Sequence, residues 1–374
     1  MIKQENILIQ KQSSGRNLEF HFSSGTVPNG ENKPNQDGLF ISQTNNETIF
    51  YGIVDGHGVI GHYFTKWVID FISKFMIDYQ IAIVNDPFDT IQLLFSMCQE
   101  NLRTSILEST DILYMLQPLQ NSNSIFYKQS EDFIVIEDDI IFIQFETIHS
   151  REIIRFPVSS GCTLTLNIII DDILYVSILG DSSSFFGKKD FAMQQLSVDS
   201  EMSFEESLRM KKYDTKIVYD QTNHCLGPDL FDENGIQNKL PKYCYIKNVR
   251  EDIASLITTN IDGKKYSLAM SGSLGDFHLK ALNRTPIIQK YSLIELIGNT
   301  DNSDNNTFFI CASDGLWDNW IYKDLSSFIF NNSCIDDSCI DAQSLLIKND
   351  EIATSNFGNK KDDSTAILIK CILT

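Results

Sequence analysis

Residues 51–58 combine groups that could hold a metal ion with one that could donate a proton. An apolar run typical of a buried strand is followed directly by Asp55, Gly56, His57 and Gly58. Glycines allow a sharp turn where a side chain would clash. We therefore expect a carboxylate, a backbone carbonyl and an imidazole to lie together at a strand end, where they would suit a hard cation and acid–base chemistry.

Acidic residues also lie beside other apolar runs, which distinguishes this pattern from a lone aspartate that forms a turn or caps a helix. These residues are Asp37, Asp181, Asp314, Asp362 and Asp363. Carboxylates gathered at one end of a sheet repel one another, so the cluster is unfavourable unless cations neutralise it. The residues predict a Mg²⁺ or Mn²⁺ site with oxygen ligands.

The composition indicates a folded chain and excludes several classes of partner. Of 374 residues, 42% are hydrophobic and 21% charged, which is typical of a globular protein. The formal net charge of -20 argues against nonspecific binding of nucleic acid or of an anionic membrane. We find neither a signal-peptide layout nor an apolar run of roughly 20 residues. The eight scattered cysteines indicate reduced thiols, so we expect a cytoplasmic protein, with the nucleus as the alternative location. We also expect a monomer.

Apolar periodicity predicts the elements that must position these residues. Helices are expected at 61–80, 90–108, 201–212, 325–330 and 342–352. Strands are expected at 18–23, 38–42, 48–54, 162–170, 173–179, 308–313 and 364–372. Residues 1–16 should form a tail or an edge strand, and 213–260 should be irregular. We expect one domain over 17–374, with an insertion of some strand content at 109–158.

The ordered motifs resemble those of the metal-dependent Ser/Thr protein phosphatases of the 2C type, the PPM family. The resemblance extends from about residue 26 to the C-terminus, and its motifs lie at 34–37, 54–58, 160–163, 180–182, 268–277, 312–318 and 362–365. It implies an α+β fold, a four-layer αββα sandwich of two antiparallel β-sheets flanked by helices. Alternation and turns alone would support only a mixture of α and β.

The resemblance also implies metal ligands. Asp55 would bridge two Mg²⁺ or Mn²⁺ ions, and Gly56 would add its backbone carbonyl to one of them. Asp314 and Asp362 would complete the protein ligands of the other ion. A weaker third ion would be held by Asp181 together with Asp314, and Asp318 is a further candidate ligand for it.

The remaining implied roles concern the reaction. The enzyme would hydrolyse phosphoserine and phosphothreonine in protein substrates, using a water that bridges the two ions. Asp37 would hold a metal-bound water, and His57 would be the general acid that protonates the departing oxygen. Asp276 would be structural.

Three departures from the family pattern affect these expectations. Gln36 stands where the family has Glu or Gln; it can orient water but brings no charge. Asn32 and Lys33 stand where an arginine commonly grips phosphate, so Lys33 is either a point-charge substitute or a surface lysine. Ser271 and Gly272 replace a serine–arginine pair, which puts the anchoring of that loop in doubt.

Other functions compete with this one. The same fold could serve as a weak or inactive pseudophosphatase that acts as a binding or regulatory module, although Asp55, Asp314 and Asp362 all remain. A cysteine phosphatase would need the spacing that Cys244 and Arg250 have, but the intervening residues lack the small, glycine-rich character of a phosphate cradle. Other two-metal hydrolases usually use several histidine ligands, and this chain has only six histidines.

Overall fold

The structure is a computed structural model. It describes residues 3–13, 16–30, 34–45, 47–108, 127–147, 151, 153–189, 192–200, 216–218, 245–254, 256–261, 263–298, 307–332, 341–358 and 361–373. The predicted helix at 201–212 lies outside these residues, as do Lys33, Asn32 and Cys244.

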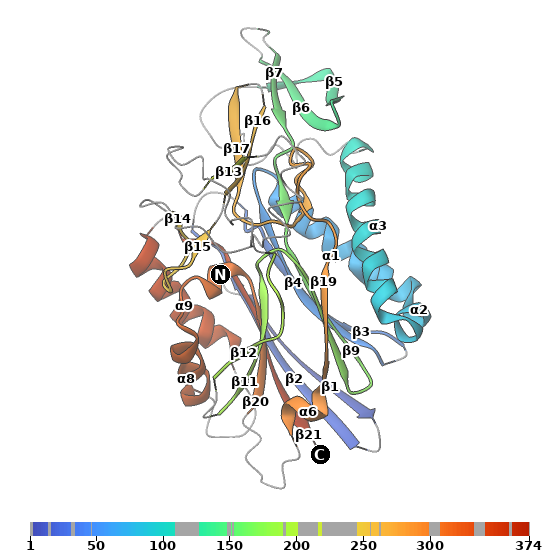
Figure 1. Ribbon diagram of the computed structural model, residues 1–374, viewed down its shortest axis with the longest axis vertical. Coiled ribbons are helices and arrows are strands. Elements are labelled where there is room, and N and C mark those ends of the chain that lie inside the picture. Colours follow the sequence, from blue (N-terminus) through green and yellow to red (C-terminus); the bar gives the residue numbers. More distant parts are fainter. Residues whose placement is uncertain are drawn as a thin grey trace, which may run out of the picture.

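Two antiparallel sheets form the centre of the molecule (Figure 1). The first has the order β1-β2-β21-β20-β11-β12, with bounds Lys3–Ser13, Arg16–Val27, Ser364–Leu373, Thr307–Ala312, Ser183–Lys188 and Gln194–Gln195. The second has the order β18-β8-β4-β9-β10-β19, with bounds Leu274–Gly275, Gly161–Cys162, Ile49–His57, Leu164–Ile170, Ile173–Leu179 and Ile287–Ser292. Strand β3 (Asp37–Gln43) also pairs with β4.

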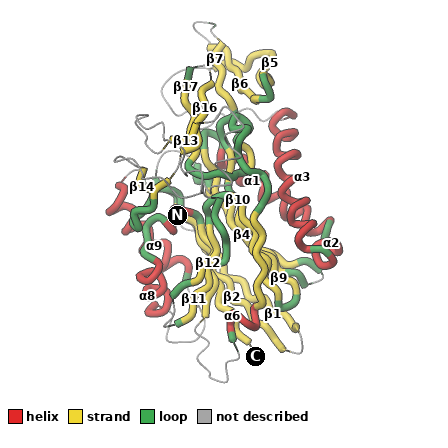
Figure 2. Tube along the Cα trace, viewed as in Figure 1, coloured by secondary structure: helices red, strands yellow, loops and turns green. Residues whose placement is uncertain are grey.

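Helices cover the outer face of each sheet, which gives the predicted α+β sandwich of four layers (Figure 2). The second sheet is covered by α1 (Gly61–Asp78), α2 (Gln80–Asn85) and α3 (Pro87–Glu108). The first sheet is covered by α8 (Tyr322–Asn332) and α9 (Ala342–Phe357). Two short helices, α6 (Leu293–Ile297) and α7 (Asp314–Trp317), follow strands β19 and β20. None of the described helices has the length and hydrophobicity needed to cross a membrane.

Strand β4 lies between β3 and β9 and is buried on both faces. Because successive side chains of a strand point to opposite faces, Ile49, Tyr51 and Ile53 pack toward the first sheet, whereas Phe50 and Val54 pack beneath α1 and α3. This two-sided burial explains why the sequence of β4 is apolar without interruption until its end.

Several boundaries differ from the predicted ones. The predicted strand 162–170 is divided at Thr163 into β8 and β9. The Thr163 hydroxyl, instead of a backbone carbonyl, accepts the hydrogen bond of the Asp55 N–H at 3.3 Å. Of the two alternatives for the first residues, the structure has the edge strand, since β1 pairs with β2 along its whole length.

Within the described parts of the chain, three small sheets lie outside the sandwich. One falls in the predicted insertion and consists of β5 (Tyr127–Glu137), β6 (Ile140–Thr147) and β7 (Ile153–Pro157). A second consists of β13 (Lys216–Val218), β16 (Leu256–Ile261) and β17 (Lys264–Leu268). The third is the hairpin of β14 (Tyr245–Ile246) and β15 (Ile253–Ala254).

Neighbouring leucines on α3 test which face of the helix supports the second sheet. Leu94 is 0% exposed and Leu93 is 43% exposed. We expect Leu94→Ala to lower the free energy of unfolding by about 2–5 kcal/mol, because it leaves a cavity in the core. Leu93→Ala, the same substitution one residue earlier, should stay within about 1 kcal/mol of wild type. Urea denaturation measures both, and equal losses would contradict this packing.

Candidate active site

Both sheets deliver acidic side chains to the same end of the sandwich. Asp37 and Asp55 are cross-strand partners at the ends of β3 and β4. Tyr51, Ile53 and Asp55 are every second residue of β4, so their side chains share one face of the strand. The Asp55 side chain therefore points toward the first sheet, as those of Tyr51 and Ile53 do. On the first sheet, Ser313 follows β20 and donates its hydroxyl hydrogen bond to Asp37 Oδ2 at 2.7 Å. This contact joins the two sheets at the acidic end.

Two further predicted ligands lie at the neighbouring strand ends of the first sheet. Asp314 opens α7 directly after β20, and Asp362 precedes β21. Asp181 follows β10 of the second sheet. Five of the predicted acids therefore gather from strand ends that are far apart in the sequence.

The acids perturb one another strongly. Burial is the largest of the effects that raise the pKa of Asp37 to about 8; the hydrogen bond from Ser313 opposes it, and the carboxylates of Asp363, Asp362 and Asp314 add to it. Burial also raises the pKa of Asp55 well above its ordinary value, and Asp37 contributes next. Asp37 and Asp55 are half-buried, and neighbouring carboxylates of this kind are stabilised by a compensating cation.

The donor set fits divalent cations. Asp181 Oδ1 is buried and accepts no hydrogen bond, so one acid oxygen still lacks a partner. No three His, Cys, Asp or Glu side chains among the described residues are close enough to hold an ion by themselves. Mg²⁺ commonly binds through one or two carboxylates and keeps several waters, so this spacing suits it better than it suits a closed all-protein cage.

The end of β4 and the turn after it need glycine for reasons of space and conformation. A Cβ on Gly56 would lie 2.5 Å from Thr65 Oγ1 and 2.6 Å from the Gly61 carbonyl oxygen. Gly58 has φ +79°, in the left-handed region that favours glycine. Gln36 donates its side-chain N–H to the Gly58 carbonyl at 2.6 Å, a bond that a glutamate could not make. This amide therefore holds the turn.

Asp363 has a positioning role that the motifs did not assign to it. Its two carboxylate oxygens accept hydrogen bonds from the backbone N–H groups of Asn29 at 2.7 Å and Gln36 at 2.9 Å. Asp363 is buried and Asp362 is exposed. Two adjacent aspartates thus have different environments, and only the structure separates them.

His57 is held by the aspartate that was expected to be structural. His57 Nε2 lies 2.7 Å from Asp276 Oδ2, which also accepts a hydrogen bond from the Ser273 hydroxyl at 2.6 Å. Burial would lower the pKa of His57, but the charge and hydrogen bond of Asp276 raise it overall. Burial would raise the pKa of Asp276, but His57 opposes this and the pKa falls to about 2. The pair therefore favours an imidazolium facing a carboxylate.

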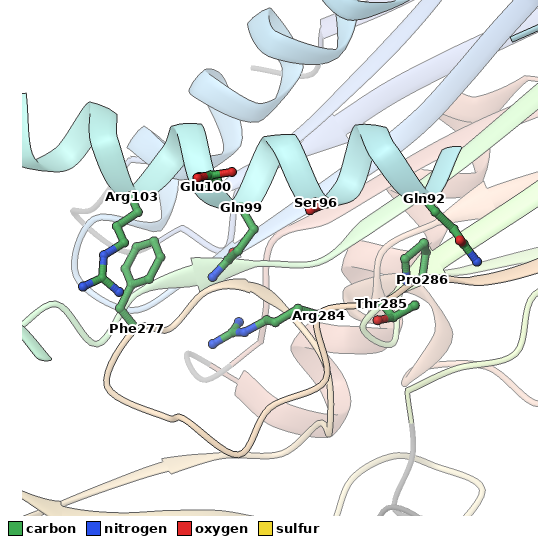
Figure 3. Close-up of a pocket in the computed structure, with 9 residues that line it drawn as sticks. All are labelled: Gln92, Ser96, Gln99, Glu100, Arg103, Phe277, Arg284, Thr285 and Pro286. Carbon is green, nitrogen blue, oxygen red and sulfur yellow. The ribbon is translucent and has the colours of Figure 1, made fainter. Parts of the chain in front are cut away.

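Arg284 anchors the loop that carries Asp276. It donates to the carbonyl oxygens of Ser273, Asp276 (3.0 Å) and Leu279 (3.4 Å). Figure 3 shows Arg284 in a pocket beneath α3. In this pocket the Gln99 side chain donates a hydrogen bond to the Gly275 carbonyl and accepts one from the Gly275 N–H. The loop is therefore anchored although the serine–arginine pair is absent. Among the described site residues predicted from the sequence, none lines this pocket.

The cysteine alternative finds no support in the described residues. The Arg250 guanidinium donates to the Trp317 carbonyl and to the Trp320 carbonyl at 2.9 Å, and it lies 4.6 Å from the Tyr322 ring centroid. It is therefore engaged in packing. Cys162 is fully buried, and burial raises the pKa of its thiol well above the ordinary value.

Comparison with known proteins agrees with this geometry. The family model described as Protein phosphatase 2C matches residues 117–338, more than half of the chain. The motifs at Asp37, Asp55, His57 and Asp362 lie outside this match. A search of curated proteins finds no match.

Two solved structures share the fold at low sequence identity. A serine-threonine phosphatase 2C from Toxoplasma gondii has a TM-score of 0.59 and 13% identity, with 99% of each chain covered. A sex determining protein from C. elegans has a TM-score of 0.54 and 13% identity, with 94% of this chain covered. This chain spans 64% of the length of the C. elegans protein. The likeness establishes the shared fold.

A buried histidine in the Asp276 loop predicts a loss of stability in acid. Burial lowers the pKa of His278 from 6.5 to about 4, against the opposing charge of Asp276. Unfolding therefore takes up a proton between these values, so stability falls as the pH falls from 6.5 toward 4. At pH 5 we expect a loss of roughly 2 kcal/mol relative to pH 7.

The measurement is urea denaturation of wild type and His278→Gln at pH 7 and pH 5. Glutamine does not titrate, so the variant should lose less stability on acidification, whatever its stability at pH 7. Parallel losses in the two proteins would contradict the assignment.

Proposed function

The chain belongs to the protein phosphatase 2C family, and we propose from this premise that it hydrolyses phosphoserine and phosphothreonine in proteins. The observation that carries the proposal is the convergence of Asp37, Asp55, Asp314 and Asp362 at one end of the sandwich. His57 follows Asp55 on the same strand face, so a proton donor lies beside the acids.

Asp55, Asp314 and Asp362, with the Gly56 carbonyl, would hold two Mg²⁺ or Mn²⁺ ions. When bound, such ions supply Lewis-acid charge that activates water and neutralises phosphoryl oxygens. Asp37 is aligned by Ser313, and its raised pKa agrees with a role in holding water at the acid cluster. Lys33 is our proposed additional contact for the substrate phosphate.

His57 would protonate the departing serine or threonine oxygen. An alkoxide is a poor leaving group, so a positioned acid speeds its departure. Asp276 favours the protonated imidazole and orients it through the 2.7 Å contact at Nε2. Arg284, in turn, fixes the loop of Asp276. This arrangement would favour the protonated form of His57, which is the form that can donate a proton.

The open position of the site would admit a protein substrate. Asp362 is exposed, and the His57 side chain is 23% exposed, so a phosphorylated segment of another protein could approach the acids. The four described cysteines whose state is resolved, Cys98, Cys162, Cys311 and Cys371, are buried and unpaired. They support our proposal of a cytoplasmic protein, because reducing compartments keep thiols free. We also propose that the protein is a monomer.

A pseudophosphatase is the second candidate, and one observation favours it. The Lys247 ammonium lies against Asp181 and 3.3 Å from Asp314, where a divalent ion would otherwise compensate the acids. If the lysine blocked all metal binding, the fold would serve only as a binding module. The experiments below separate these two functions.

Asp314→Asn tests the metal-dependent reaction. Asparagine keeps the shape but removes one ligand charge, so turnover of a phosphothreonine peptide in Mn²⁺ should fall by at least about 100-fold. A chelator should abolish wild-type turnover. The peptide assay is run with and without Mn²⁺ on the folded proteins.

Asp324→Asn is the matched control, because Asp324 is an exposed aspartate in the first turn of α8. It should retain wild-type turnover, as should Cys244→Ser. Folded protein that binds Mn²⁺ without turnover would identify the pseudophosphatase. Turnover that survives the chelator but is lost in Cys244→Ser would overturn the metal mechanism.

His57→Gln tests the proton donor. With a phosphothreonine peptide, turnover should fall by about 10²–10⁴-fold, because no acid protonates the leaving oxygen. With p-nitrophenyl phosphate, the loss should be much smaller, because nitrophenolate leaves without a proton. The ratio of the two rates is the measurement.

His21→Gln is the control for that ratio, since His21 is a partly exposed histidine on β2 that contacts Glu19. It should leave both rates unchanged. Equal losses on both substrates in His57→Gln would argue against the proton-donor role.

A further inference from the structure

Lys247 places a positive charge inside the acid cluster. Its ammonium group contacts Asp181 Oδ2 and lies 3.3 Å from Asp314 Oδ2. The side chains of Lys247, Asp181 and Asp314 are 18%, 10% and 20% exposed, so water screens these interactions only weakly.

The lysine is fixed by the β14–β15 hairpin. The Lys247 N–H donates to the Asp252 carbonyl at 2.8 Å. The Val249 N–H donates to the Asp318 carbonyl at 3.0 Å, directly after α7. Arg250 ties the same turn to the carbonyl of Trp320 at 2.9 Å. The hairpin is therefore docked on the segment that begins with Asp314, and this docking aims the lysine at the acids.

The charges around Lys247 are those expected around a bound cation. Two carboxylates, those of Asp181 and Asp314, lie within ion-pair distance of the same ammonium group. The lysine and the acids therefore offset each other's charge.

We propose that Lys247 is a built-in cation that takes the place of a third metal ion between Asp181, Asp314 and Asp318. The chain would then bind two divalent ions, held at Asp55, Gly56, Asp314 and Asp362. An ammonium and a divalent ion repel each other strongly at contact distance in a weakly screened site. This inference rests on the proposed function, because it assumes that the remaining acids bind metal.

The proposal makes Lys247 a positioning residue. Asp314 would contact both a metal ion and the lysine. The hairpin would therefore fix the orientation of this metal ligand, and the lysine would leave the position of that metal ion free. The charge that a loosely bound ion would supply is covalently attached, and it does not depend on the concentration of free metal.

The test counts bound Mn²⁺ directly. Wild type, Lys247→Met and Lys247→Arg are dialysed against Mn²⁺ up to millimolar concentrations, and bound metal is measured by elemental analysis. We expect two ions in wild type and in Lys247→Arg, and three in Lys247→Met, whose side chain is similar in length but uncharged. Lys11→Met, at a buried lysine on β1 that bonds the Glu47 carbonyl, should bind two.

A thermal melt provides a second readout. In chelator, Lys247→Met should melt at a lower temperature than wild type, because the carboxylates around position 247 then have no cation beside them. Addition of Mn²⁺ should raise the melting temperature of Lys247→Met more than that of wild type. Three ions in wild type, two in Lys247→Met, or equal Mn²⁺ shifts would each overturn the proposal. No bound ion in wild type would overturn the proposed metal mechanism as well, so the two failures are distinguishable.

Discussion

Repulsion between carboxylates gathered at one end of the sandwich, most of them half-buried, is the constraint on which the rest of this structure depends. Asp37 and Asp55 face each other across a strand pair, and Asp314 and Asp362 approach from the other sheet. Hydrophobic packing of the sandwich brings these acids together, although their charges alone would separate them. The free energy of the fold must therefore offset the repulsion, or cations must cancel it. A site of this kind is selective for positive charge before any ligand geometry is considered.

The alternation of side chains along β4 turns that packing into a functional arrangement. Ile49, Tyr51 and Ile53 fix which face of the strand meets the first sheet. A shift of one residue in register would move these residues, with Asp55 and His57, to the helical face. The same apolar contacts that stabilise the sandwich thus determine where the carboxylate and the imidazole point. Core and site cannot be altered independently on this strand.

Much of this was predictable from the sequence because it depends on local patterns. Unbroken apolar runs that end in acids predicted the strands and the cluster, and helical spacing predicted α1 and α3. The layers needed the family resemblance, because periodicity does not say which strands pair. The different surroundings of Asp362 and Asp363 could not be predicted, since both precede the same strand and only the loop contacts to Asn29 and Gln36 separate them.

The residues that the motifs did not reveal act across the fold, and they supply positive charge. Arg284 replaces an anchor expected close to Asp276 in the sequence, but it comes from after the loop and binds backbone carbonyls. Lys247 comes from the turn of the β14–β15 hairpin, outside the sandwich, and reaches Asp181, which is distant in the chain. Cationic side chains are long, so their position in the sequence says little about where their charge lies. An acidic site assembled from strand ends can therefore draw its compensating charge from any segment that packs beside it, and a motif comparison will not detect such a substitution.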